Sequence, residues 1–373
     1  MKYPRQITVT QAAAILISTI IGVGVLPLPL FAVRAAGSGA PLITLISCFV
    51  AFIGLWLIAL LGMRFPNQTI IQYSETIIGK WPARLGSAFI ICFFAILTSL
   101  TAREFGEVVV ASVLRRTPLE ITVIVMLLLA CFSARNNIIE FAYLHYFYLP
   151  LLLGPGLLIV VLSLKNADMT NLQPIWGESP QTMLSGIFTV SALFQGSFIF
   201  TMVIPAMRQP TKAMKASFWG LLISGGLYIL ITLAAVSVFG SEETRKLLWP
   251  TLELAKTTSL PGNILERLDA AFLAVWVIAV FTTLFSSYYI TIHSMSSLFH
   301  LRNHKMFSLF LLPIVFILAM LPQNVLQMYD IIEKVGRIGL WITIAYPGVL
   351  LVMALIRKKS GGCHEKQTAD GTN

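Results

Sequence analysis

The stretch STIIGVGVLPLPLF, residues 18–31, lies in the middle of the first long apolar segment of the chain. Gly22, Gly24, Pro27 and Pro29 fall inside it, and a proline removes a backbone donor and obstructs the preceding helical turn. If this segment crosses a membrane, the interruption leaves backbone N–H and C=O groups unpaired in the bilayer. Such groups are tolerated at that depth only where they are buried in protein or line a cavity. The stretch therefore predicts a broken membrane helix beside an enclosed cavity.

The composition of the whole chain supports a membrane protein. Of 373 residues, 57% are hydrophobic and 11% are charged, whereas a soluble domain carries roughly 25% charged residues. A helix needs roughly 20 apolar residues to cross the bilayer. The apolar segments that could do so are residues 10–33, 40–63, 86–112, 118–134, 138–164, 182–207, 216–239, 268–299, 307–321 and 336–356. The predicted fold class is an all-α membrane protein of about ten transmembrane helices, with residues 1–373 forming a single transmembrane domain.

A second interruption follows five spans after the first. In SALFQGSFIF, residues 191–200, the polar or small residues Gln195, Gly196 and Ser197 fall at mid-membrane. The two interruptions open two groups of five spans, residues 10–164 and 182–356, which would be inverted repeats because five is an odd number. Paired interrupted segments in corresponding positions indicate a transporter-type binding site. The alternative is that the glycines only allow helices to pack closely.

The distribution of positive charge predicts the orientation in the membrane. With ten spans, both ends of the chain lie on one side, which collects fifteen Lys and Arg residues against ten on the other side, with Arg103 inside a span. The positive-inside rule places both termini in the cytoplasm. This bias explains most of the net charge of +10, so nucleic acid is not an expected partner. Residues 68–80 are predicted to form a short amphipathic helix on the cytoplasmic face, and the polar residues 360–373 a disordered cytoplasmic tail.

The third span carries further candidate residues. Leu97 and Thr101 could wall a pocket between spans one, three, six and eight. Arg103, Glu104 and Glu107 lie toward the outer end, where Arg103 and Glu107 are spaced to pair along one helix face. Ionisable residues inside a membrane are candidates for function. The alternative for these three is that they extend to the outer interface and only cap the span.

Spans five and eight add hydroxyl groups and one histidine. Thr283, Ser286 and Ser287 belong to a hydroxyl cluster on span eight, and Thr283 could reach a bound solute. Ser286 and Ser287 could instead join a cation site, although such hydroxyls more often bond to their own helix backbone. His145 is expected to be a packed, hydrogen-bonded residue rather than a proton relay.

Several motifs give the chain a resemblance to a known family. Beyond the GVG turn, they are TAREFGEVV followed by RRTPLE (101–120), NLQPIWGE (171–178), LLWPT (247–251) and ERLDAAFLAVWVIAVFTT (266–283). The sequence resembles the amino acid–polyamine–organocation transporter superfamily and, within it, the B subunit of spore germinant receptors. The resemblance implies a LeuT-like fold with helices one and six broken. In sodium-coupled relatives, hydroxyls at the place of Ser286 and Ser287 take part in an ion site.

The resemblance also implies a function. A germinant receptor B subunit is expected to bind a small nutrient, such as an amino acid, in the inner membrane of the spore. It would work beside an A subunit and a lipoprotein C subunit, within membrane lipid. The proposed contacts are the backbone around Gly22 and Gly24, with Leu97, Thr101, Gln195, Gly196, Ser197 and Thr283, while Pro27, Pro29, Arg103, Glu104 and Glu107 would serve gating or structure.

Two other functions and several absences complete the prediction. The alternatives are a proton- or sodium-coupled amino-acid permease and a channel for ions or water. The four cysteines are scattered, and no CxxC or HExxH motif occurs, so no metal site or cofactor is expected. No nucleophile–base pair or phosphate loop stands out, so the chain is not expected to be an enzyme.

Overall fold

The computed structural model describes residues 5–176, 180–258, 268–301 and 303–361. The predicted disordered tail lies almost entirely outside these residues. Within them the fold is helical and contains no strand. The helices are α1 (Val9–Ile20), α2 (Leu28–Ala36), α3 (Ala40–Arg64), α4 (Ile70–Ile78), α5 (Lys80–Ser112), α6 (Leu119–Ser133), α7 (Ile138–Ser163), α8 (Pro180–Ser191), α9 (Phe200–Val203), α10 (Ala213–Lys246), α11 (Pro250–Thr257), α12 (Leu268–Leu298), α13 (Lys305–Met320), α14 (Val325–Leu340) and α15 (Tyr346–Ile356).

Short 3-10 and π segments connect or interrupt these helices. The 3-10 segments are η1 (Val23–Val25), η2 (Gly37–Gly39), η3 (Leu164–Asn166), η4 (Met169–Leu172), η5 (Ala192–Ile199), η6 (Ile204–Ala206) and η7 (Pro210–Lys212), and η8 (Trp341–Ala345) is a π segment. Two of them mark the predicted interruptions. The α-helix stops at Ile20 and resumes at Leu28 around η1, and it changes to 3-10 geometry over η5.

The helices account for the ten predicted spans. In the described part of the chain, seven helical stretches are long and apolar enough to cross a membrane, and three shorter apolar helices accompany them. The chain turns between α2 and α3 at Gly37, whose positive φ of 55° suits glycine. Helix α2 therefore continues α1 as the first span, and α3 is the second. Spans six and ten are likewise composite, made of α8, η5 and α9, and of α14, η8 and α15.

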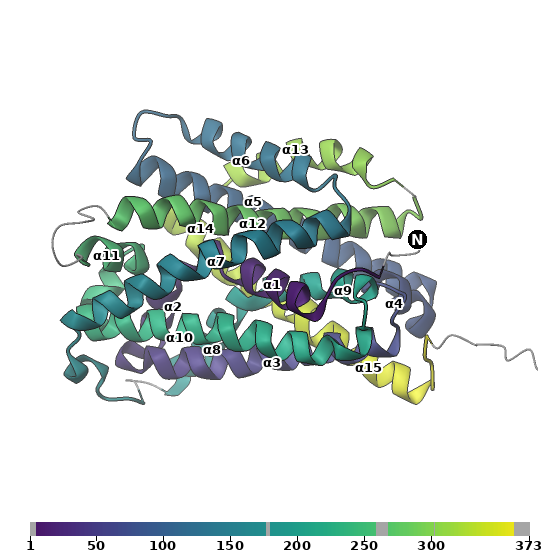
Figure 1. Ribbon diagram of the computed structural model, residues 1–373, viewed down its shortest axis with the longest axis horizontal. Coiled ribbons are helices and arrows are strands. Elements are labelled where there is room, and N and C mark those ends of the chain that lie inside the picture. The colour runs from purple at the N-terminus through teal and green to yellow at the C-terminus, as the bar shows by residue number, and fades with distance from the viewer. Residues whose placement is uncertain (1–4, 177–179, 259–267, 302, 362–373) are drawn as a thin grey trace, which may run out of the picture.

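The two ends of the described chain lie at the same end of the bundle. Ile7 donates a backbone hydrogen bond to Ala206 (3.0 Å), and Gly361 donates one to Arg64 (3.0 Å) beside the amphipathic helix α4. Figure 1 shows α4 and the N-terminus at one end of the long axis, and α11 at the opposite end. An even number of membrane crossings produces this arrangement.

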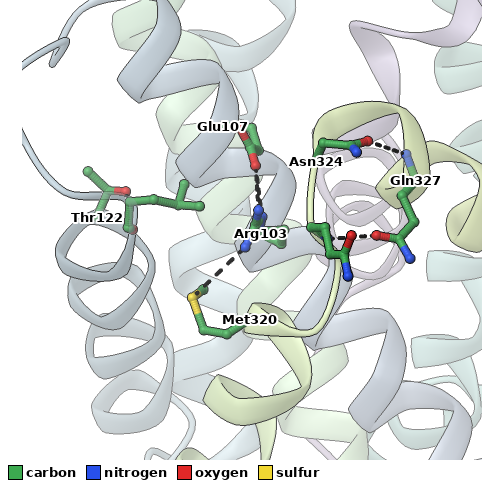
Figure 2. Close-up of polar contacts among 8 residues, drawn as sticks. Arg103, Glu107, Thr122, Met320, Asn324 and Gln327 are labelled. Carbon is green, nitrogen blue, oxygen red and sulfur yellow. Dashed lines mark hydrogen bonds and ion pairs between the residues drawn. The ribbon is translucent and has the colours of Figure 1, made fainter.

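The tenth span begins earlier than the sequence predicted. Apolar residues begin to dominate near residue 336, but α14 starts at Val325. Its outer part exposes Gln327, Asp330 and Lys334, which lower the mean hydropathy of that segment. The Asn324 side chain accepts a hydrogen bond from the Gln327 backbone (2.9 Å) and caps this start (Figure 2). The prediction of residue 336 was therefore wrong by about three helical turns.

Candidate functional site

The carbonyl groups left free where α1 ends find partners inside the protein. Hydroxyls of α10 and α12 donate to the last three of them: Thr282 to Ser18 (2.8 Å), Thr283 to Thr19 (2.9 Å) and Tyr228 to Ile20 (2.5 Å). At the end of η1, the Thr251 hydroxyl of α11 donates to the Val25 carbonyl (2.7 Å). The interruption thus survives in the bilayer because neighbouring spans supply the missing hydrogen bonds.

A cavity lies between the two interruptions. It offers about 80 Å³ of free space to water-sized molecules, well above the roughly 10–15 Å³ that one buried water needs. Its walls come from α1, η1, α2, α5, α8, η5, α12 and α14, and most lining residues are apolar. The polar side chains in the lining are Thr19, Thr101, Glu104, Thr189, Gln195, Thr283, Ser287 and Glu333.

Most of the predicted binding residues line this cavity. They are Gly24, Leu97, Thr101, Gln195, Gly196 and Thr283, together with Pro27 and Ser287. Gly22 and Ser197 do not line it. Gly22 packs on α12 instead, and Ser197 faces a smaller pocket beside span ten. Pro29 is buried in the first turn of α2, where its missing N–H leaves no hydrogen bond unmade.

Gln195 is fixed by the tenth span. Its Nε2 donates to the Gly336 carbonyl (2.5 Å), and its buried Oε1 has no hydrogen-bond partner in the described part of the chain. Both Gln195 and Gly336 line the cavity. The interruption of span six is therefore held in place by a contact that the sequence prediction did not include.

Of the ionisable residues of span three, Arg103 and Glu104 are buried and Glu107 is partly exposed. Arg103 and Glu107 form the predicted pair, with 2.7 Å between Nη2 and Oε1. Figure 2 shows Arg103 directed at Glu107 and at Met320. Neither Arg103 nor Glu107 lines the cavity. Glu104 is 2% exposed and does line it. Its carboxylate accepts a hydrogen bond from the Tyr329 hydroxyl (3.2 Å).

The sequence prediction missed the contribution of span ten and the end of α1. Ile332, Glu333 and Gly336 of α14 line the cavity, as does Thr19. Glu333 pairs with Arg337 and also accepts a hydrogen bond from Thr189 (3.2 Å). The sequence predicts span ten only from residue 336, so Ile332 and Glu333 lie outside the predicted span. A search for amphipathic periodicity over residues 325–340 could have found them.

One member of the hydroxyl cluster of span eight, Ser286, lies beside His145. Ser18 Oγ lies 2.5 Å from Nδ1 of His145, and Ser286 Oγ lies 3.2 Å from Nε2. Ser286 also bonds to Thr19 Oγ1 (2.8 Å) and to its own helix at the Thr282 carbonyl (2.8 Å). His145 is fully buried, as expected for a packed, hydrogen-bonded histidine. Ser287 bonds to the Leu284 carbonyl (3.0 Å) of its own helix. The hydroxyls considered for an ion site are thus engaged with protein groups.

The described residues hold no group of three or more His, Cys, Asp or Glu side chains that could bind a metal ion. The chemistry that the cavity offers is hydrogen bonding and charge. Backbone N–H groups of Val23 and Gly24 have no backbone acceptor among the described residues, and both residues line the cavity. The cavity therefore combines apolar walls, backbone donors at one interruption and two carboxylates, one on span three and one on span ten.

Comparison with solved structures shows that this architecture is the LeuT-like transporter fold. It is similar to Mhp1, a nucleobase-cation-symport-1 family transporter solved closed with bromovinylhydantoin bound (TM-score 0.60, 14% identity, 96% of this chain and 81% of that chain covered). It is also similar to a Na⁺-coupled sialic acid symporter in a substrate-bound outward-open state (TM-score 0.66, 13% identity, the same coverage). The chain is thus an integral membrane protein with ten spans in two inverted repeats.

The family follows from the sequence. The family model described as spore germination protein matches residues 6–328, and the chain belongs to this family. Spore germination protein YndE of Bacillus subtilis (strain 168) is 28% identical over 95% of this chain and 98% of its own. Spore germination protein B2 of that strain is 24% identical over 96% and 98%, and GerLB of Bacillus cereus is 25% identical over 92% and 93%. The resemblance predicted from the sequence motifs is confirmed.

Proposed function

We propose that this chain is the B subunit of a nutrient germinant receptor and binds a small nutrient, an amino acid, in the cavity between the two interrupted spans. The observation that carries the proposal is the cavity itself, since it joins both interruptions in one largely apolar chamber with few polar groups. Small-molecule sites combine these two properties. Membership of the spore germination protein family supports a role in germination.

The proposed binding mode uses the backbone of the first interruption. The N–H groups of Val23 and Gly24 would bind the carboxylate of the nutrient, as successive free N–H groups bind anions elsewhere. Gln195, Gly196 and Thr283 would complete the pocket. A nutrient that binds one arrangement of the interrupted spans more tightly shifts the population toward it, and partner subunits would respond to that shift.

The proposal includes the surroundings of the chain. An A subunit and a lipoprotein C subunit would be the partners, in the inner membrane of the spore, with both termini in the cytoplasm. The excess of Lys and Arg on the side of the termini supports this orientation. The chain would act by binding and not as an enzyme, because the polar groups of the cavity form hydrogen bonds and ion pairs and none is a serine or cysteine placed beside a histidine base.

A coupled amino-acid permease is the second candidate, and one observation favours it. Both solved structures named above are transporters whose fold this chain shares. Uptake separates the two functions. Labelled nutrient that accumulates in vesicles containing only this chain would favour a permease, whereas binding without accumulation would favour a receptor.

The proposed site can be tested with Gly24→Leu. A Cβ at Gly24 would lie 3.2 Å from the Leu193 side chain, so the longer leucine side chain has to enter the cavity. We expect the variant to accumulate and to lose binding by about tenfold or more, because the nutrient and the leucine would occupy the same space. A thermal-shift screen of the purified full chain against the twenty amino acids and D-glucose measures this.

Gly154→Leu is the matched control. Gly154 lies in α7, and a Cβ there would have no neighbour within 4 Å, so this leucine adds the same apolar bulk away from the cavity. Binding should be unchanged. Normal binding by Gly24→Leu would place the nutrient site elsewhere in the protein.

A further inference from the structure

Two carboxylates line the cavity, and they differ in their partners. Glu333 forms an ion pair with Arg337 and accepts a hydrogen bond from Thr189. Glu104 has no cationic partner among the residues that the structure describes, since the adjacent Arg103 pairs with Glu107 at 2.7 Å. A carboxylate that is 2% exposed without a counter-ion is costly, because burial removes the solvation of its charge.

The side chains around Glu104 are arranged to keep it an acceptor. The Trp249 indole N–H donates to the Tyr329 oxygen (2.7 Å), and the Tyr329 O–H donates to Glu104 Oε1 (3.2 Å). The Tyr329 ring is fixed by an edge contact with Phe31, with 5.6 Å between the ring centroids. Because tyrosine has one proton to donate, this order of donors makes Glu104 Oε1 the acceptor of the hydrogen bond from Tyr329.

We infer that Glu104 recognises the ammonium group of the ligand and thereby selects a protonated amine over neutral solutes. The inference rests on the proposed function and specifies the substrate class of the same cavity. An ammonium supplies the missing positive charge and three N–H donors, and such charge-assisted hydrogen bonds are stronger than neutral ones. A sugar or a hydroxy acid offers hydroxyl groups but no positive charge, so it leaves the buried carboxylate unpaired.

The same contacts link recognition to the outer end of the bundle. Trp249 directly precedes α11, and the Thr251 hydroxyl within α11 donates to the Val25 carbonyl of the first interruption. A carboxylate can accept at both of its oxygens, so an amine can bind Glu104 while the Tyr329 hydrogen bond to Oε1 is kept. Glu104, Tyr329 and Trp249 thus connect the amine site to the start of α11 through two hydrogen bonds in series.

The test compares amines with matched hydroxy acids on the purified full chain. The probes are the twenty amino acids, the corresponding 2-hydroxy acids (L-lactate for L-alanine, for example), D-glucose and D-fructose, with affinity measured by calorimetry after a thermal-shift screen. We expect at least one amino acid to bind about tenfold or more tightly than its hydroxy acid, because a hydrogen bond to a charged group is lost in the latter. Glu104→Gln should remove this preference while hydroxy-acid binding stays the same.

Asp330→Asn is the matched control, since it neutralises an exposed carboxylate of α14 that does not line the cavity, and it should keep the preference for amines. If Glu104→Gln does not accumulate, Glu104→Asp retains the charge and should retain the preference. Amino-acid binding with the same preference in Glu104→Gln would overturn the inference and leave the cavity assignment intact. A wild-type chain that binds only sugars or hydroxy acids would also overturn the inference that Glu104 selects an amine. If no probe binds, both the inference and the proposed function are wrong.

Discussion

Gly22 packs so closely on α12 that a Cβ in its place would lie 1.7 Å from Thr283 Oγ1. Gly196 makes the equivalent contact on span six, where a Cβ would lie 2.8 Å from the Thr19 carbonyl oxygen. These glycines therefore allow close helix packing, as one of the two interpretations of the sequence predicted. Gly196 and Gly24 also line the cavity. Close packing and cavity formation are thus combined at the interruptions.

His145 is a second residue whose role can be tested. His145→Leu removes both nitrogens that contact Ser18 and Ser286, and it changes the packing against Phe141, whose ring centroid lies 4.3 Å away. We expect a loss of stability of about 1–3 kcal/mol, measured as a lower thermal midpoint of the purified protein. Tyr143→Leu, at an exposed position of the same helix, should have little effect. Equal midpoints for wild type and His145→Leu would contradict this role.

The sequence predicted much of the cavity because backbone chemistry constrains where an interruption can lie. Gly24, Gln195 and Gly196 follow from that rule, and Thr283 follows from its place on span eight. Thr19 and Glu333 could not be predicted in this way. Which face of a helix turns inward depends on how the spans pack, and the pairing of Glu333 with Arg337 becomes visible only when both are placed on α14.

Among the elements, α11 holds the outer side of the first interruption. The Thr251 hydroxyl is buried and donates to Val25 at 2.7 Å. Thr251→Val keeps the shape of the side chain and removes the donor, which leaves the Val25 carbonyl unpaired. We expect faster hydrogen–deuterium exchange over residues 250–257, measured by mass spectrometry on the purified chain.

Thr257→Val provides the comparison on the same helix. Among the residues that the structure describes, the Thr257 hydroxyl bonds only to carbonyls of its own helix, at Glu253 (3.1 Å) and Leu254 (3.2 Å), so its loss should leave the exchange of α11 nearly unchanged. Equal exchange in the two variants would mean that the contact with Val25 does not hold α11 in place.

At the scale of the whole molecule, the ten spans and the charge bias predict which end of the bundle faces the cytoplasm. In a chain without Cys48, Cys92, Cys131 and Cys363, a new cysteine at Thr257 should react with a membrane-impermeant maleimide on intact cells. A cysteine at Thr76 in α4 should react only after permeabilisation. Both positions are exposed, and α11 and α4 lie at opposite ends of the bundle (Figure 1). The reverse pattern of labelling would invert the proposed orientation.

The three hydroxyl contacts at the end of α1 also stabilise the observed position of α1 against α10 and α12. Tilting α1 away from α10 and α12 breaks all three together, and at about 0.5–1.5 kcal/mol each they favour the resting geometry by about 1.5–4.5 kcal/mol. About 1.4 kcal/mol is a factor of ten in an equilibrium constant. The three contacts would therefore lower the population of a form with α1 tilted away by roughly ten- to a thousandfold. In the proposed receptor, this energy difference would make activation without nutrient rarer.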